Sequence, residues 1–124
     1  MFELKVVSSF SAAHYLRGYK GKCENLHGHN WKVEVVVSNK ELDSIGIVID
    51  FKKLKEAAEN VLKEIDHKCL NDISPFDEKN PSSENIAVYV YNRLEEILKD
   101  KNCSLRSVSI WEQDNSQAVY YGEE

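Results

Sequence analysis

The chain lacks the features of a fibrous, membrane-spanning or nucleic-acid-binding protein. Its 124 residues include only five glycines, two prolines and one methionine, and they contain no repeat or low-complexity tract. No apolar run approaches the length of a membrane-spanning helix, so we expect no membrane partner. A net charge of −5 leaves no basic excess, which argues against a nucleic-acid partner.

Cysteine is also scarce, and the spacing of Cys23, Cys69 and Cys103 suggests no pairing. An odd number of cysteines without paired spacing predicts reduced thiols and a cytoplasmic location. The chain has neither a glycine-rich dinucleotide loop nor a P-loop, so we expect no redox cofactor. Residues 1–5 lead directly into an alternating pattern, which predicts no signal peptide. The length predicts one domain over residues 1–124.

The pattern of apolar residues predicts the elements of an α+β fold. Alternation predicts strands over residues 2–14, 31–37, 105–113 and 118–121, with a short extended piece over 46–50. The order β-β-α-α-β-β then predicts a four-stranded antiparallel sheet with two helices packed on one face. The other face of the sheet is either exposed to water or meets another subunit.

Two helices are predicted from caps and from apolar residues spaced three and four apart. The first is expected to begin after its N-cap, Asp50, and to end near Asp66-His67. The second is expected between a serine cap, at Ser82 or Ser83, and a stop near Asn102.

Three of the four histidines lie within 16 residues of each other, and they predict a metal site. In an extended chain His27 and His29 point to the same side, and Gly28 is expected to let the backbone approach closely. With His14 they form a set of three neutral nitrogen ligands, which is typical of zinc sites that keep one position open. Zinc is the first expectation, and iron or another first-row metal is the alternative.

Cys23 lies four residues before His27, where two roles are open to it. As a fourth ligand it would close the site and make the metal structural. As a thiolate beside the metal and Lys22 it would be an acidified nucleophile or base. The spacing favours neither role over the other.

Further polar residues have a structural and a functional interpretation each. His67 follows a helix end, where a charged imidazole is favoured, or it shuttles protons with Asp66 as its partner. Glu112 falls on the same side of its predicted strand as apolar residues, where a carboxylate is costly. Its carboxylate therefore either reaches water at the strand end or accepts two N–H donors from a ligand. The loop cations Arg17, Lys20 and Lys22 are either solvated or part of an anion clamp.

These residues fall in an order that resembles the 6-pyruvoyltetrahydropterin synthase and 6-carboxytetrahydropterin synthase family. The matching segments span nearly the whole chain and are Phe10-Ser11-Ala12-Ala13-His14, Cys23-x-x-x-His27-Gly28-His29, Asp50-Phe51-x-x-Leu54-Lys55, Asp66-His67-x-x-Leu70-Asn71, Asn80-Pro81-Ser82-Ser83-Glu84-Asn85 and Trp111-Glu112.

The resemblance implies a tunnelling fold, in which protomers join their sheets into a barrel as trimers that stack into hexamers. It implies active sites between subunits. It also implies zinc on His14, His27 and His29, with Cys23 as the proton acceptor rather than a ligand.

The resemblance further implies a pterin triphosphate as substrate. His67 with Asp66 would relay protons, and Glu112 would do so too while anchoring the amino edge of the pterin. Ser83 and Glu84 match a segment that contacts the pterin. The triphosphate contacts are hypothesised to come from Arg17, Lys20, Lys22 and Lys32.

The three residues between Cys23 and His27 resemble the 6-carboxytetrahydropterin synthase branch of queuosine (7-deazaguanine) biosynthesis. This branch converts 7,8-dihydroneopterin triphosphate to 6-carboxytetrahydropterin and releases acetaldehyde and triphosphate. Residues 111–123 resemble the pyruvoyl branch, which eliminates triphosphate without carbon–carbon cleavage and is the alternative. A non-enzymatic, zinc-stabilised binding module is the third hypothesis.

Overall fold

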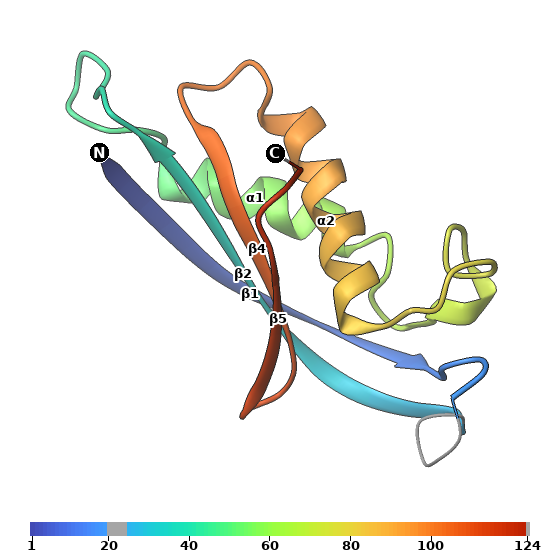
Figure 1. Ribbon diagram of the computed structural model, residues 1–124. Coiled ribbons are helices and arrows are strands. Elements are labelled where there is room, and N and C mark those ends of the chain that lie inside the picture. The colour runs from blue at the N-terminus through green and yellow to red at the C-terminus, as the bar shows by residue number, and fades with distance from the viewer. Residues whose placement is uncertain (20–24, 124) are drawn as a thin grey trace.

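The computed structural model describes residues 1–19 and 25–123 of the chain (Figure 1). A sheet with two helices on one side forms the molecule, which confirms the predicted α+β class. The elements in order are β1 (Phe2–His14), β2 (His27–Asn39), α1 (Phe51–Leu62), β3 (Lys68–Cys69), a 3₁₀ helix (Leu70–Asp72), α2 (Ser83–Leu98), β4 (Ser104–Gln113) and β5 (Ser116–Tyr120).

The sheet has five strands in the order β3-β1-β2-β4-β5, so the predicted number of four is wrong. The extra strand, β3, pairs in parallel with Ala12 and Ala13 of β1. Two residues are too short for an alternating pattern to be visible in the sequence. The other neighbouring pairs are antiparallel, as predicted.

The register of β1 and β2 turns their apolar residues to the helix-covered face. Phe10 pairs with Trp31, and the two rings stack with their centroids 5.6 Å apart. Because side chains alternate along a strand, His27 and His29 lie on the same face as Trp31. The fully buried side chains of this layer and of the helices include Trp31, Val33, Val35, Leu54, Ile86, Leu94 and Ile110.

Both helices begin where their caps predict. The Asp50 side chain accepts a hydrogen bond from the Lys52 amide at 2.8 Å, and Ser82 accepts one from the Asn85 amide at 3.1 Å. Of the two serines considered, the structure therefore selects Ser82 as the N-cap.

The predicted ends of several elements are wrong. Helix α1 ends at Leu62 instead of near Asp66-His67, because residues 63–67 form turns. Helix α2 ends at Leu98 and not at Asn102. Residues 46–50 are bends and irregular backbone rather than an extended strand, and β5 begins two residues earlier than expected.

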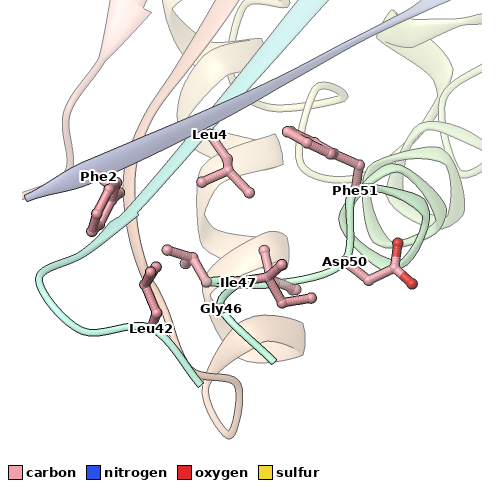
Figure 2. A pocket seen from close by; sticks show the side chains of 9 residues that line it. Phe2, Leu4, Leu42, Gly46, Ile47, Asp50 and Phe51 are labelled. Atoms are coloured by element: carbon pink, nitrogen blue, oxygen red, sulfur yellow. The ribbon is translucent and has the colours of Figure 1, made fainter. Parts of the chain in front are cut away.

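An apolar pocket of about 330 Å³ lies at the end of β1 far from its histidine. Figure 2 shows the side chains of Phe2, Leu4, Leu42 and Phe51 around it. The carboxylate of Asp50, which also lines it, is engaged in capping α1. This pocket therefore offers little for polar recognition. None of the described helices is both long and apolar enough to cross a bilayer.

Two residues of helix α1 test how much burial in the core contributes to the free energy of unfolding. Leu54 is fully buried, whereas Phe51, three residues earlier on the same helix, is 58% exposed. We expect Leu54→Ala to cost about 2–5 kcal/mol of unfolding free energy, because it leaves a cavity in the core. Phe51→Ala should cost much less. Urea unfolding at one fixed protein concentration measures both, and equal losses would contradict this account.

Candidate functional site

Four side chains from three strands converge at one end of the sheet. They are His14 at the end of β1, His27 and His29 at the start of β2, and Glu112 near the end of β4. Their ligand-type atoms all lie within 4.8 Å of one another. Because β1 pairs His14 with His27 and Ala12 with His29, the hairpin itself brings the imidazoles together. The group can hold a metal ion.

Two of the imidazoles are oriented by backbone carbonyls. The Nδ1 atom of His14 lies 2.7 Å from the Pro81 carbonyl oxygen, and that of His27 lies 2.7 Å from the Asn25 carbonyl oxygen. A carbonyl oxygen only accepts, so each Nδ1 carries the proton and each Nε2 keeps a lone pair. This is the arrangement that fixes histidine ligands around metals.

The Nε2 atoms of His14 and His29 are buried without a hydrogen-bond partner among the described residues. Glu112 Oε1 lies 3.1 Å from His14 Nε2 and 3.3 Å from His29 Nε2, but not in hydrogen-bond geometry. The nitrogens and the oxygen thus lie close together without satisfying one another. An unpaired buried nitrogen is costly, and a bound cation would remove that cost. The residues fit a divalent metal ion.

Burial also favours the neutral form of a ligand. Burial lowers the pKa of His29, while the Glu112 carboxylate partly opposes this effect. The side chain of Trp31, which is fully buried, supports the group from behind. Its Nε1 donates to the Ala12 carbonyl at 3.2 Å, and its ring meets those of His14 and His29 edge-on.

Gly28 lies between the two histidines of β2 with room beside it. A Cβ at this position would meet only the Ala12 carbonyl oxygen at 3.8 Å, which is ordinary contact, and its φ is not positive. The described part of this chain therefore does not require glycine here, and a close approach of the backbone to a bound group stays a prediction.

A small polar pocket of about 170 Å³ adjoins the group and shares Glu112 with it. The sequence analysis singled out two further lining residues, Ser83 and Glu84, which begin α2. Ser116, Gln117 and Ala118 complete the lining, and the sequence analysis missed them. The turn-forming residues Asp114-Asn115-Ser116 were the available signal, because this turn folds β5 back beside Glu112.

Asp66 and His67 lie together but outside this group. Asp66 Oδ1 is 2.9 Å from His67 Nδ1, and it accepts a hydrogen bond from the Ser11 amide at 2.8 Å. The His67 side chain is 80% exposed. The structure therefore does not bring this pair to the imidazoles of its own protomer.

The structure describes only one of the four loop residues considered as site residues. Cys23, Lys20 and Lys22 lie outside the described residues. Arg17 donates through Nη2 to the backbone carbonyls of Asn71 and Phe76 at 3.3 and 2.9 Å, whereas its buried Nη1 has no hydrogen-bond partner among the described residues.

Lys32, the fourth hypothetical triphosphate contact, lies on the sheet face opposite the imidazoles. Its Nζ is 4.2 Å from the centre of the Trp111 ring and 3.7 Å from a Glu34 oxygen. The proposal that Arg17 and Lys32 contact the triphosphate stays a prediction, because neither residue belongs to the imidazole group of this chain.

Comparisons with known proteins identify close relatives. The family model described as 6-pyruvoyl tetrahydropterin synthase matches residues 3–123. A 6-carboxy-5,6,7,8-tetrahydropterin synthase of Haemophilus influenzae is 31% identical, over 97% of this chain and 99% of its own length. A dihydroneopterin monophosphate aldolase of Pyrococcus furiosus is 40% identical, over 85% and 84%. The 6-pyruvoyl tetrahydropterin synthase structure from Caenorhabditis elegans superposes with a TM-score of 0.88 at 33% identity, covering 98% and 96%.

Removing one imidazole tests the metal site directly. We expect His29→Ala to weaken Co²⁺ binding by more than about 100-fold, since even residues behind a ligand cost 10- to 100-fold when lost. His67→Ala, the histidine outside the group, is the matched control and should bind as the wild type does. Titration followed by the visible absorption of Co²⁺ measures both. Equal affinities in the two variants would rule out this group as the site.

Proposed function

The chain belongs to the 6-pyruvoyl tetrahydropterin synthase family, and from this premise we propose that it is a 6-carboxy-5,6,7,8-tetrahydropterin synthase. It converts 7,8-dihydroneopterin triphosphate to 6-carboxytetrahydropterin, with release of acetaldehyde and triphosphate, in the cytoplasmic synthesis of queuosine. The convergence of three imidazole nitrogens beside Glu112 carries the proposal, because this reaction needs a cation next to a pterin anchor.

The choice of branch has its own support. Three residues separate Cys23 from His27, the short spacing that resembles the carboxy branch. The Haemophilus influenzae relative, matched over nearly its whole length, carries the name of that branch. The pyruvoyl reaction remains the alternative, because the Caenorhabditis elegans relative has a closely similar structure.

Zinc is the proposed ion, and His14, His27 and His29 are its proposed ligands. Three neutral imidazoles and an open position are a typical catalytic zinc set. When bound, the ion supplies a Lewis acid that polarises the side-chain oxygens of the substrate. The Pro81 and Asn25 carbonyls hold two of these imidazoles in the tautomer that a ligand requires.

The proton transfers are assigned to side chains of this chain. Cys23, as a thiolate, accepts a proton from the substrate side chain. A neighbouring cation lowers the pKa of a thiol and thereby favours this ionised form. His67 returns protons, and Asp66 orients its imidazole through Nδ1.

Glu112 is proposed to anchor the pterin as well as to relay protons. A carboxylate accepts the amino and ring N–H groups of a pterin edge as a matched pair. Glu112 belongs both to the imidazole group and to the lining of the small polar pocket, so a pterin there lies next to the ion. Ser83 and Glu84 line the same pocket and are the further proposed contacts.

A homo-oligomer, with hexamer as the expected state, is proposed as the active form. The exposed His67 does not reach the imidazoles of its own protomer, so its role requires the site of another copy. The uncovered sheet face also supports assembly. It carries the paired Lys5 and Glu34 at 3.0 Å and a Trp111 whose Nε1 donates to Glu34 at 2.8 Å.

Product analysis tests the function. Incubation of the zinc-loaded protein with 7,8-dihydroneopterin triphosphate is expected to give acetaldehyde and 6-carboxytetrahydropterin in equal amounts, identified by mass spectrometry. A 6-pyruvoyl product without acetaldehyde would show that the protein catalyses the pyruvoyl reaction instead. Dihydroneopterin monophosphate serves as the parallel substrate, and turnover of the monophosphate alone would contradict both branches.

Mixing two inactive variants tests the shared site. Cys23→Ala and His67→Ala should each keep zinc and fold but lose turnover by about 100-fold or more, since each removes a proton-transfer group. Subunit exchange between them should restore part of the activity, because some sites then combine an intact Cys23 with an intact His67. No recovery despite exchange, seen by native mass spectrometry, would place the whole site in one protomer. If Cys23→Ala loses zinc and stability together, the protein is instead a closed zinc-binding module.

A further inference from the structure

Residues 63–67 carry His67 from the end of α1 to the edge of the sheet. Ile65 is fully buried within this turn. His67 has a φ of +59°, in the left-handed region that residues other than glycine adopt only when surrounding contacts hold them there. The position of the His67 imidazole therefore depends on what holds the turn.

Strand β1 holds one side of the turn. The Ser11 amide donates to Asp66 Oδ1 at 2.8 Å, and the His67 amide donates to the Ser11 carbonyl. The Ser11 hydrogen bond holds the pKa of Asp66 below its ordinary value, so the carboxylate that faces His67 stays charged.

Helix α2 holds the other side through three residues that we name the Glu64 clamp: Glu64, Tyr89 and Arg93. Glu64 Oε1 accepts from the Tyr89 hydroxyl at 2.5 Å and from Arg93 Nε at 3.1 Å. Arg93 Nη2 donates to Glu64 Oε2 at 2.7 Å. A bidentate guanidinium–carboxylate pair fixes the orientation of the Glu64 side chain as well as its distance from Arg93, which a single hydrogen bond does not.

The members of the clamp remain in the charge states that it needs. The Arg93 hydrogen bond holds the pKa of Glu64 below its ordinary value, and the same pair raises the pKa of Arg93. Burial and the Glu64 contact raise the pKa of Tyr89 to about 12, so its hydroxyl keeps the proton that it donates.

Helix α2 also reaches the imidazole group at its other end. The Pro81 carbonyl, directly before the N-cap Ser82, accepts from His14 Nδ1. The same rigid element thus contacts a proposed metal ligand at its start and, through Tyr89 and Arg93, the turn of His67 two to three helical turns later. A movement of the turn relative to α2 therefore also moves His67 relative to the helix that contacts His14.

We propose that Arg93, assisted by Tyr89, is a positioning residue that acts through Glu64 to hold His67 where it transfers protons. Its effect on turnover rests on the proposed function, whereas its effect on the turn does not. No residue of the clamp belongs to the imidazole group or lines the small polar pocket. Its loss should therefore change proton transfer and leave substrate and metal binding intact.

Two measurements on Arg93→Gln in the full-length, zinc-loaded assembly test this inference. Amide hydrogen exchange at His67 should quicken by about tenfold, because the turn loses its attachment to α2. The kcat should fall by about 10- to 100-fold with KM and zinc content unchanged, since a small misplacement of a catalytic group has an effect of this size. Arg93→Lys, which keeps the charge but not the fork, should fall between Arg93→Gln and the wild type.

Glu96→Gln is the matched control, because Glu96 is the other carboxylate beside Arg93, at 3.5 Å on the same helix. It should leave both measurements unchanged. In a His67→Ala background Arg93→Gln should cause no further loss of kcat, since the two act on one step. Unchanged exchange at His67, or an equal loss of kcat in both backgrounds, overturns the inference. If the wild type yields no pterin product, the proposed function fails, and the exchange measurement alone still decides whether the clamp holds the turn.

Discussion

The hairpin of β1 and β2 pairs His14 with His27, and the rest of the site depends on this register. Side chains on a strand alternate between faces, so a shift of one residue in β2 would move His27 and His29 to the uncovered face. The same shift would expose Trp31 and Val33, which are fully buried. The hydrophobic energy of the core thus maintains the geometry of the imidazole group, although no apolar residue needs to touch an ion.

The His14 and His29 nitrogens that lie beside Glu112 carry an energetic cost that the described residues do not offset. Both Nε2 atoms are buried without a hydrogen bond, so they lose hydration and gain no partner in return. A bound cation would pair with these nitrogens and so stabilise the folded protein. A structure whose polar groups converge without satisfying each other is organised around something that binds there.

Much of this arrangement could be predicted from the sequence, and the reasons for the failures are physical. Parity along β1 and β2 was enough to put the three histidines on one face, because alternation is a local property. The position of Glu112 among the imidazoles was not predictable, since it depends on the bulge between β4 and β5 and on side-chain reach. The end of α1 was predicted too late because Ile65 continues the apolar spacing of the helix although it lies in the following turn. The carbonyl of Pro81 and the Glu64 clamp join residues far apart in the chain, which periodicity does not reveal.

Strand β3 pairs only with Ala12 and Ala13, so in the described part of the chain no strand lies beside the outer margin of β1 between Phe2 and Phe10. Alternate residues there direct backbone N–H and C=O groups outward, and such a margin pairs with any extended chain that reaches it. Until this margin is covered, it can pair with segments of other unfolded chains and start an aggregate. In the homo-oligomer proposed above another copy would cover it, so the yield of folded protein should then depend on the concentration of newly made chains.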